Sequence, residues 1–189
     1  QTGTTTELNL ADFFRLNGIS YEALPIETND EGKENLFAGR CDVYTTDASG
    51  LSSTRAAAAD PSKWLVLPEI ISKEPLGPLV RHGDHQWGDV VRWSLNAMII
   101  AEELGVSSEN VDASKSSNVP EVLRLLGVEG SYGEMLELAP DWAYQIIKQI
   151  GNYSESYEAN VGPDTPLEIA RGLNALWTQG GILYAPPFR

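Results

Sequence analysis

The sequence is poor in the residues that bind metals or react as nucleophiles. It holds one cysteine, Cys41, and two histidines, His82 and His85, in 189 residues. A single cysteine excludes a disulfide within the chain, and we expect Cys41 to be a small buried side chain at the start of a strand. The two histidines lie where a loop meets a helix, with no further ligand cluster nearby. We therefore expect no metal site and no cofactor.

Basic residues and long apolar runs are also scarce. Lysine and arginine total 13 against 27 aspartates and glutamates, which gives a net charge of −14. Because nucleic acids are bound by basic surfaces, this balance excludes them as partners. No apolar run approaches the roughly 20 residues that a membrane-spanning helix needs. The hydrophobic content of 42% is ordinary for a globular protein with a sizeable core.

Apolar spacing predicts alternating helices and strands in the first part of the chain. Alternation of this kind is typical of an α/β fold with a partly parallel sheet. Proline and glycine then cluster at residues 74–80, as expected where a chain crosses between two lobes. The predicted helices are residues 5–16, 29–39 and 48–59, and the predicted strands are residues 19–26, 41–46 and 64–71.

The remainder of the chain is predicted to be mainly helical. Its strongest helix covers residues 84–104, where apolar side chains recur at helical spacing. A serine-rich loop is expected at residues 107–118 and an extended tail at residues 180–187. Further helices are predicted at residues 120–126, 141–150 and 165–177.

Two motifs carry charges or donors suited to a small ligand. Gly3-Thr4-Thr5-Thr6 opens the first helix, and Glu7 completes a capping box in which a threonine caps and the glutamate returns to the cap N–H. Such a helix start can bind an anion through free N–H groups. Asp47 ends a predicted strand and could bind a cation, but it could equally cap the helix that follows. Each motif alone is as well explained by a helix cap, whereas a zwitterion such as an amino acid requires both.

These residues also resemble a known family. The turn at 3–7 and the segment 38–47 resemble the second lobe of the periplasmic amino-acid-binding proteins of ABC importers. The similarity is greatest to the general L-amino-acid-binding subgroup, and it runs over nearly the whole chain. Further matching motifs are residues 68–78, 80–84, 101–106 and 172–177.

The resemblance implies a two-lobe, type II periplasmic-binding-protein fold of the α/β class. Residues 1–76 would form the second lobe, and residues 77–189 the hinge crossing and the C-terminal, mainly helical part of the first lobe. We expect the N-terminal part of that first lobe to be missing, so the first lobe would be only partly represented. Self-association of copies would be one way to cover the surface thereby exposed.

The resemblance also assigns roles to individual residues. The hydroxyl and backbone of Thr5 would bind the ligand α-carboxylate, in a turn shaped by Gly3 and Thr4, and Asp47 would pair with the α-ammonium. The remaining two expected contacts are weaker: Thr2 would edge the pocket, and Thr46 would touch the ligand side chain. The implied partners are a free L-amino acid and the membrane permease of an ABC transporter, and the implied compartment is the periplasm.

Two other classes of function stay open at this point. A dehydratase of the same fold would use its cleft carboxylates for acid–base chemistry, and a sensor-type or degenerate module would have lost its transport ligand. The sequence favours a binding protein over an enzyme, because it contains no nucleophile with a neighbouring base.

Overall fold

The chain folds into two compact units, each with its own internal contacts. The computed structural model describes residues 1–73 and 76–188. Unit 1 comprises Gln1–Leu76 with Pro166–Ile169, and unit 2 comprises Gly77–Thr165 and Ala170–Arg189. The predicted crossing at 74–80 begins with two residues that lie outside the described ones. The assignment of these units to the two lobes stays a prediction.

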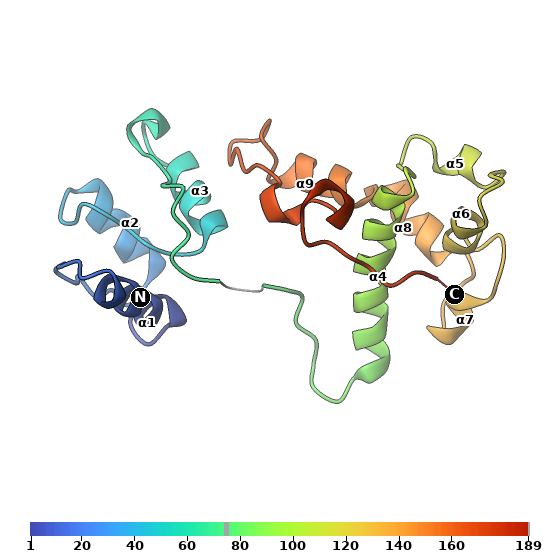
Figure 1. The fold of residues 1–189 in the computed structure, drawn as a ribbon, viewed down its shortest axis with the longest axis horizontal. Coiled ribbons are helices and arrows are strands. Elements are labelled where there is room, and N and C mark those ends of the chain that lie inside the picture. The colour runs from blue at the N-terminus through green and yellow to red at the C-terminus, as the bar shows by residue number, and fades with distance from the viewer. Residues whose placement is uncertain (74–75, 189) are drawn as a thin grey trace. The chain divides into compact units, whose positions relative to one another are not determined.

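Unit 1 contains three α-helices and one short 3-10 turn (Figure 1). The helices end within three residues of their predicted limits, and a glycine follows the ends of α1 and α2. Gly18, with φ +63°, and Gly39, with φ +69°, adopt the left-handed backbone conformation that follows many helices. The elements are α1 (Thr5–Leu16), α2 (Asn29–Phe37), α3 (Ala48–Ala56) and η1 (Pro61–Lys63).

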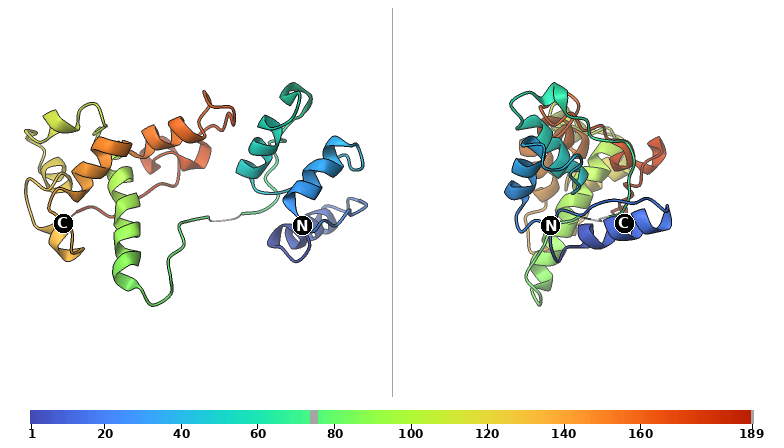
Figure 2. Two further views of the ribbon diagram at one scale, coloured as in Figure 1. Left: turned by 180° about the vertical axis from the view of Figure 1, so that it is seen from behind. Right: turned by 90° about the vertical axis from the view of Figure 1, so that its left-hand side faces the viewer.

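The three strands predicted in unit 1 do not form among the described residues. Residues 19–26, 41–46 and 64–71 lack strand pairing, and Figure 2 draws these connections without arrows. A strand is completed by hydrogen bonds to a neighbouring strand, which an apolar pattern in one segment does not supply. Cys41 is half-buried rather than buried in a strand. The strand predictions are therefore wrong for this part of the chain, and the α/β layering stays a prediction.

Unit 2 is built around one long helix, α4 (His85–Glu103). Its N-cap residue is Asp84, whose carboxylate accepts a hydrogen bond from the Trp87 N–H at 3.1 Å. Three shorter helices pack against it, and a fourth packs on one of those three. The shorter helices of the unit are α5 (Val111–Ser114), α6 (Pro120–Leu125), α7 (Tyr132–Met135), α8 (Trp142–Ile150) and α9 (Tyr153–Asn160).

The apolar core lies in unit 2, and the fully buried side chains that α4 contributes to it come from the C-terminal half of that helix. There Ala97 and Ala101 are completely buried, whereas Trp87 near the helix start is 55% exposed. Figure 1 shows the same contrast, because the N-terminal half of α4 stands clear of α6, α8 and α9. Among the described helices, none combines the length and apolarity required to cross a bilayer.

The helix predicted at 165–177 is wrong. This segment forms only the short 3-10 turn η2 (Gly172–Asn174), and a second turn, η3 (Trp177–Gln179), follows it. The backbone of Glu168 has φ 52° and that of Gly172 has φ 49°, and neither value fits a right-handed helix. The sequence interpretation also missed α5, α7 and α9.

Candidate ligand-binding site

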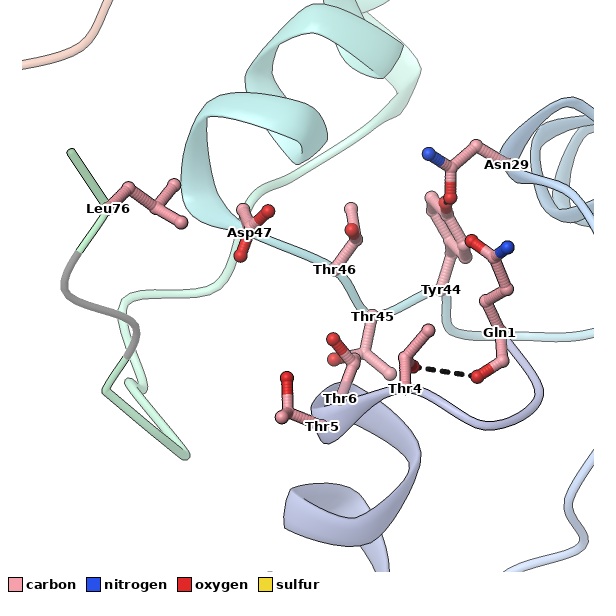
Figure 3. Close-up of a pocket in the computed structure, with 10 residues that line it drawn as sticks. All are labelled: Gln1, Thr4, Thr5, Thr6, Asn29, Tyr44, Thr45, Thr46, Asp47 and Leu76. Carbon is pink, nitrogen blue, oxygen red and sulfur yellow. Dashed lines mark hydrogen bonds between the residues drawn. The ribbon is translucent and has the colours of Figure 1, made fainter. Parts of the chain in front are cut away.

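The candidate site is a pocket of about 250 Å³ on unit 1 (Figure 3). It is smaller than the roughly 300–1,000 Å³ of pockets for drug-sized ligands, which suits a small solute. Its walls come from the start of α1, the first residue of α2 and the segment that leads into α3. The lining residues are Gln1, Thr4, Thr5, Thr6, Asn29, Tyr44, Thr45, Thr46, Asp47 and Leu76.

The backbone N–H groups at the start of α1 are not capped by any side chain of the described residues. Thr4 occupies the N-cap position, but its hydroxyl donates to the carbonyl of Gln1 at 2.7 Å instead of capping the helix. Glu7 accepts from the N–H of Gly3 at 2.8 Å, one residue before the position that a capping box requires. The predicted capping box is therefore wrong in both bonds. Because no described side chain caps α1, its first N–H groups stay available to an anion.

Asp47 also precedes a helix without capping it. It holds the N-cap position of α3, yet its carboxylate accepts no hydrogen bond from the described residues. Asp84, at the same position of α4, does form such a bond. Asp47 is exposed and is the one residue with a charged side chain among those that line the pocket. Its carboxylate is thus free to pair with a cationic group in the pocket.

A neutral polar cluster lies at the other end of the pocket. Figure 3 shows Gln1, Asn29 and Tyr44 grouped there, away from Asp47 and Leu76. The Tyr44 hydroxyl donates to Asn29 Oδ1 at 3.3 Å. Burial raises the pKa of Tyr44 above its ordinary value, so the hydroxyl is neutral at physiological pH.

The Tyr44 ring reaches this position because α2 has a glycine where the ring packs. A Cβ atom added to Gly32 would lie 2.7 Å from Tyr44 Cε2 and 2.6 Å from Ile26 Cδ1. No side chain can occupy that space without moving its neighbours. Sequence reasoning missed Asn29 and Tyr44, although a glycine inside a predicted helix is a signal of close approach.

Comparison with known proteins identifies the family of the chain. No protein-family model matches the sequence. The glutamate/glutamine/aspartate/asparagine-binding protein of Rhodobacter capsulatus is 54% identical over 190 residues, which cover all of this chain and 56% of that protein. The general L-amino acid-binding periplasmic protein of Rhizobium johnstonii is also 54% identical, over 191 residues, with the same coverage. The chain belongs to the amino-acid-binding proteins of ABC transporters.

A solved structure has the same fold as this chain. The ABC transporter periplasmic binding protein from Brucella ovis, determined with glutathione bound, superposes with a TM-score of 0.94 at 50% identity. The match covers all of this chain and 60% of that protein. The fold is therefore that of part of a periplasmic binding protein. The chain spans only 56% of the length of the curated amino-acid-binding relatives that it matches.

The structure brings together four of the six predicted contact residues. Thr4, Thr5, Thr46 and Asp47 line the pocket, as do their unpredicted neighbours Thr6 and Thr45. Sequence adjacency to the predicted residues was the only signal for these two.

The other two predicted residues, Thr2 and Gly3, do not line the pocket. The N–H and hydroxyl of Thr2 both donate to the carbonyl of Ile26, at 2.9 and 3.0 Å, so Thr2 holds the turn in place. Gly3 supplies a backbone with φ +72°. The ligand contacts of all six residues stay predictions.

Proposed function

We propose that the chain is part of a periplasmic receptor that binds free L-amino acids for an ABC importer. The receptor would deliver its ligand to the membrane permease of that importer and would catalyse no reaction. Two relatives at 54% identity support this proposal, because both are named as amino-acid-binding proteins and one is named periplasmic. Neither name describes an enzyme.

The proposed ligand lies between the start of α1 and Asp47. Its α-carboxylate accepts hydrogen bonds from the hydroxyl and N–H of Thr5, at the positive end of the helix dipole. Its α-ammonium pairs with the Asp47 carboxylate. The observation that carries the proposal is that Thr5 and Asp47 line one pocket (Figure 3), while neither N-cap side chain, Thr4 for α1 or Asp47 for α3, caps its helix.

The remaining predicted residues have secondary roles. Gly3 and Thr4 shape the turn, Thr2 holds its edge, and Thr46 contacts the ligand side chain. Every L-amino acid carries an α-carboxylate and an α-ammonium. A site that binds mainly these two groups therefore accepts several amino acids. Each hydrogen bond to a charged group contributes about 1.5–3 kcal/mol.

The Asp47 contact is tested by isothermal titration of common L-amino acids into the protein expressed from its complete gene. Asp47→Asn keeps the shape of the side chain and removes its charge. We expect it to weaken binding roughly 10- to 100-fold, which corresponds to the loss of one charge-assisted contact. Asp42→Asn is the matched control, because Asp42 is exposed and lies outside the pocket lining. If the two variants bind equally well, the ammonium role of Asp47 is wrong.

A further inference from the structure

Four residues from the C-terminal part of the chain belong to unit 1 and not to unit 2. Residues 166–169 group with unit 1, whereas Thr165 before them and Ala170 after them group with unit 2. The chain therefore joins the two units at three places: between residues 76 and 77, 165 and 166, and 169 and 170. Only the first of these lies in the segment 74–80 that the sequence predicts as a crossing.

Arg55 binds this four-residue segment. It lies in the last turn of α3, at the opposite end of that helix from Asp47. Its Nη2 atom donates to the carbonyl of Leu167 at 3.3 Å and to Glu168 Oε2 at 2.7 Å. The Arg55 side chain is only 21% exposed, so α3 presents it to the segment from a largely buried position.

The backbone at Glu168 is strained. Its φ of 52° lies in the left-handed region, which a residue with a Cβ atom rarely adopts. A residue keeps such a conformation only when the surrounding contacts hold it there. The two bonds from Arg55 reach the carbonyl just before Glu168 and the carboxylate of Glu168 itself, so they restrain the backbone at the strained position.

Both flanks of the segment are held within unit 2. On one side, the N–H and the hydroxyl of Thr165 donate to the carbonyl of Gly162, at 3.0 and 2.8 Å. On the other side, the Tyr157 hydroxyl of α9 donates to the carbonyl of Ala170 at 3.1 Å. Residues 166–169 are thus a short span with both ends held, and not the tip of a free loop.

We infer that Arg55 is a clamp that holds residues 166–169 on α3 as a releasable strap. With the clamp closed, the chain enters unit 1 a second time. With the clamp open, the strap becomes a loop of unit 2, and the chain joins the units only between residues 76 and 77. Glu168 is 63% exposed, so water and salt compete for it, and the clamp can open while α3 and the core of unit 2 stay folded. This role does not depend on the ligand.

Thermolysin, which cleaves before leucine and isoleucine, measures how often the strap is open. Cleavage of a held segment requires local opening, so its rate follows the population of the open form. In the protein expressed from its complete gene, we expect Arg55→Met to raise the rate of cleavage before Leu167 and Ile169 roughly threefold or more, because the lost ion pair is partly exposed. Cleavage before Leu79, which is 98% exposed, should keep its rate and serves as the internal reference.

Salt separates the clamp from a general packing role of Arg55. Relative to cleavage before Leu79, a rise in sodium chloride concentration should speed cleavage in the strap of the parent, because it screens the pair of Arg55 and Glu168. The same rise should have no such effect on Arg55→Met. Mass spectrometry of the products identifies each cleavage site.

A double-mutant cycle tests whether Arg55 acts through the strap. Glu168→Gln removes the charge and should speed cleavage less than Arg55→Met does, because the bond to the Leu167 carbonyl remains. The double variant should be cleaved no faster than Arg55→Met alone. Arg15→Met is the matched control, since Arg15 is another arginine of unit 1, 78% exposed and paired with Asp12 within α1. It should leave the rate unchanged. Circular dichroism spectra establish that each variant is folded.

Three outcomes would overturn the clamp. The first is an unchanged rate of cleavage in the strap of Arg55→Met. The second is an equal rise before Leu79 and in the strap, which would mean that the substitution loosens the protein as a whole. The third is full additivity of Arg55→Met and Glu168→Gln, which would mean that the two side chains act separately. None of these outcomes bears on the proposed function, which is decided by the titration of L-amino acids.

Discussion

The two units bury their apolar residues very differently. In unit 2 the buried apolar side chains form one cluster that extends from Ala97 to Phe188 and includes Leu125 and Ile147. In unit 1 the single buried apolar side chain among the described residues is Ile26, at 6% exposure. Leucines of comparable size are widely exposed there, with Leu65 at 78% and Leu16 at 82%.

This contrast indicates that the candidate site stands on the less well packed unit. Its geometry depends on hydrogen bonds between neighbouring segments, such as Thr2 to Ile26 and Gln1 to Glu27. Exposed hydrogen bonds contribute modestly to stability, whereas unit 2 gains from the burial of apolar area. Unit 2 should therefore carry most of the stability and unit 1 most of the ligand recognition.

The largest expected effect comes from the core of unit 2. Ile147→Ala removes a completely buried side chain of α8 and should lower the free energy of unfolding by about 2–5 kcal/mol. Leu65→Ala, at a position 78% exposed in unit 1, should change it by less than about 0.5 kcal/mol. Urea unfolding followed by circular dichroism measures both. Equal losses would show that unit 1 is packed as tightly as unit 2.

The sequence predicted helices better than strands because the two kinds of evidence differ. The limits of α1, α2 and α4 follow from local signals, such as Gly18, Gly39 and the Asp84 cap, which act within a few residues. Strand pairing depends on a distant segment, and no single stretch encodes it. The helix predicted at 165–177 does not form, because Glu168 adopts a left-handed backbone conformation. Glutamate rarely adopts this conformation, so the sequence offered no reason to expect it.

The same distinction between local and distant signals explains why only some residues of the site were predicted. Thr5 and Asp47 carry recognisable motifs, and the structure places both on one pocket. Asn29 and Tyr44 carry no motif. Their proximity arises from the missing side chain at Gly32, which lets the Tyr44 ring pack against α2. Sequence spacing could not place Gln1 and Asn29 on one pocket, because the position of Gln1 depends on the bonds of Thr2 and Gln1 to residues 26 and 27.

A second test compares one ion pair from each unit. In unit 2, Arg171 Nη2 lies 3.0 Å from Glu102 Oε1, and the two side chains are 15% and 9% exposed. In unit 1, Arg55 Nη2 lies 2.7 Å from Glu168 Oε2, but the Glu168 side chain is 63% exposed. Arg171→Met would leave Glu102 buried and unpaired and should cost about 2–4 kcal/mol.

Arg55→Met should cost less than about 1 kcal/mol, because water solvates the carboxylate of Glu168 once the pair is lost. Arg171 also lies over the rings of Tyr153 and Tyr157, 5.3 Å from each centroid, and these contacts add to its loss. Urea midpoints of the two variants provide the comparison. A larger loss for Arg55→Met would mean that segment 166–169 is essential to the stability of unit 1.

The smallest expected effect is a pH dependence that originates in unit 2. The Glu155 carboxylate accepts hydrogen bonds from the Ser108 N–H at 3.1 Å and from the Asn152 N–H at 2.8 Å. Burial alone would raise the pKa of Glu155, but the hydrogen bonds from Ser108 and Asn152 outweigh it and hold the pKa below its ordinary value. A lowered pKa in the folded state stabilises the protein fully above the unfolded pKa, near 4.3. That contribution is lost as the pH falls through the folded pKa.

Glu155→Gln cannot titrate and should therefore lose less stability than the parent between pH 5 and pH 3, although it starts less stable at pH 7. Ser108→Ala removes the hydroxyl bond, retains the carboxylate and should give an intermediate slope. Urea midpoints at several pH values provide the measurement, and the difference from the parent curve cancels the other carboxylates. Parallel curves for the parent and Glu155→Gln would locate the acid sensitivity outside the contact between Glu155 and Ser108. The tightly packed unit would then owe its acid response to other residues, and the contrast between the two units would rest on apolar burial alone.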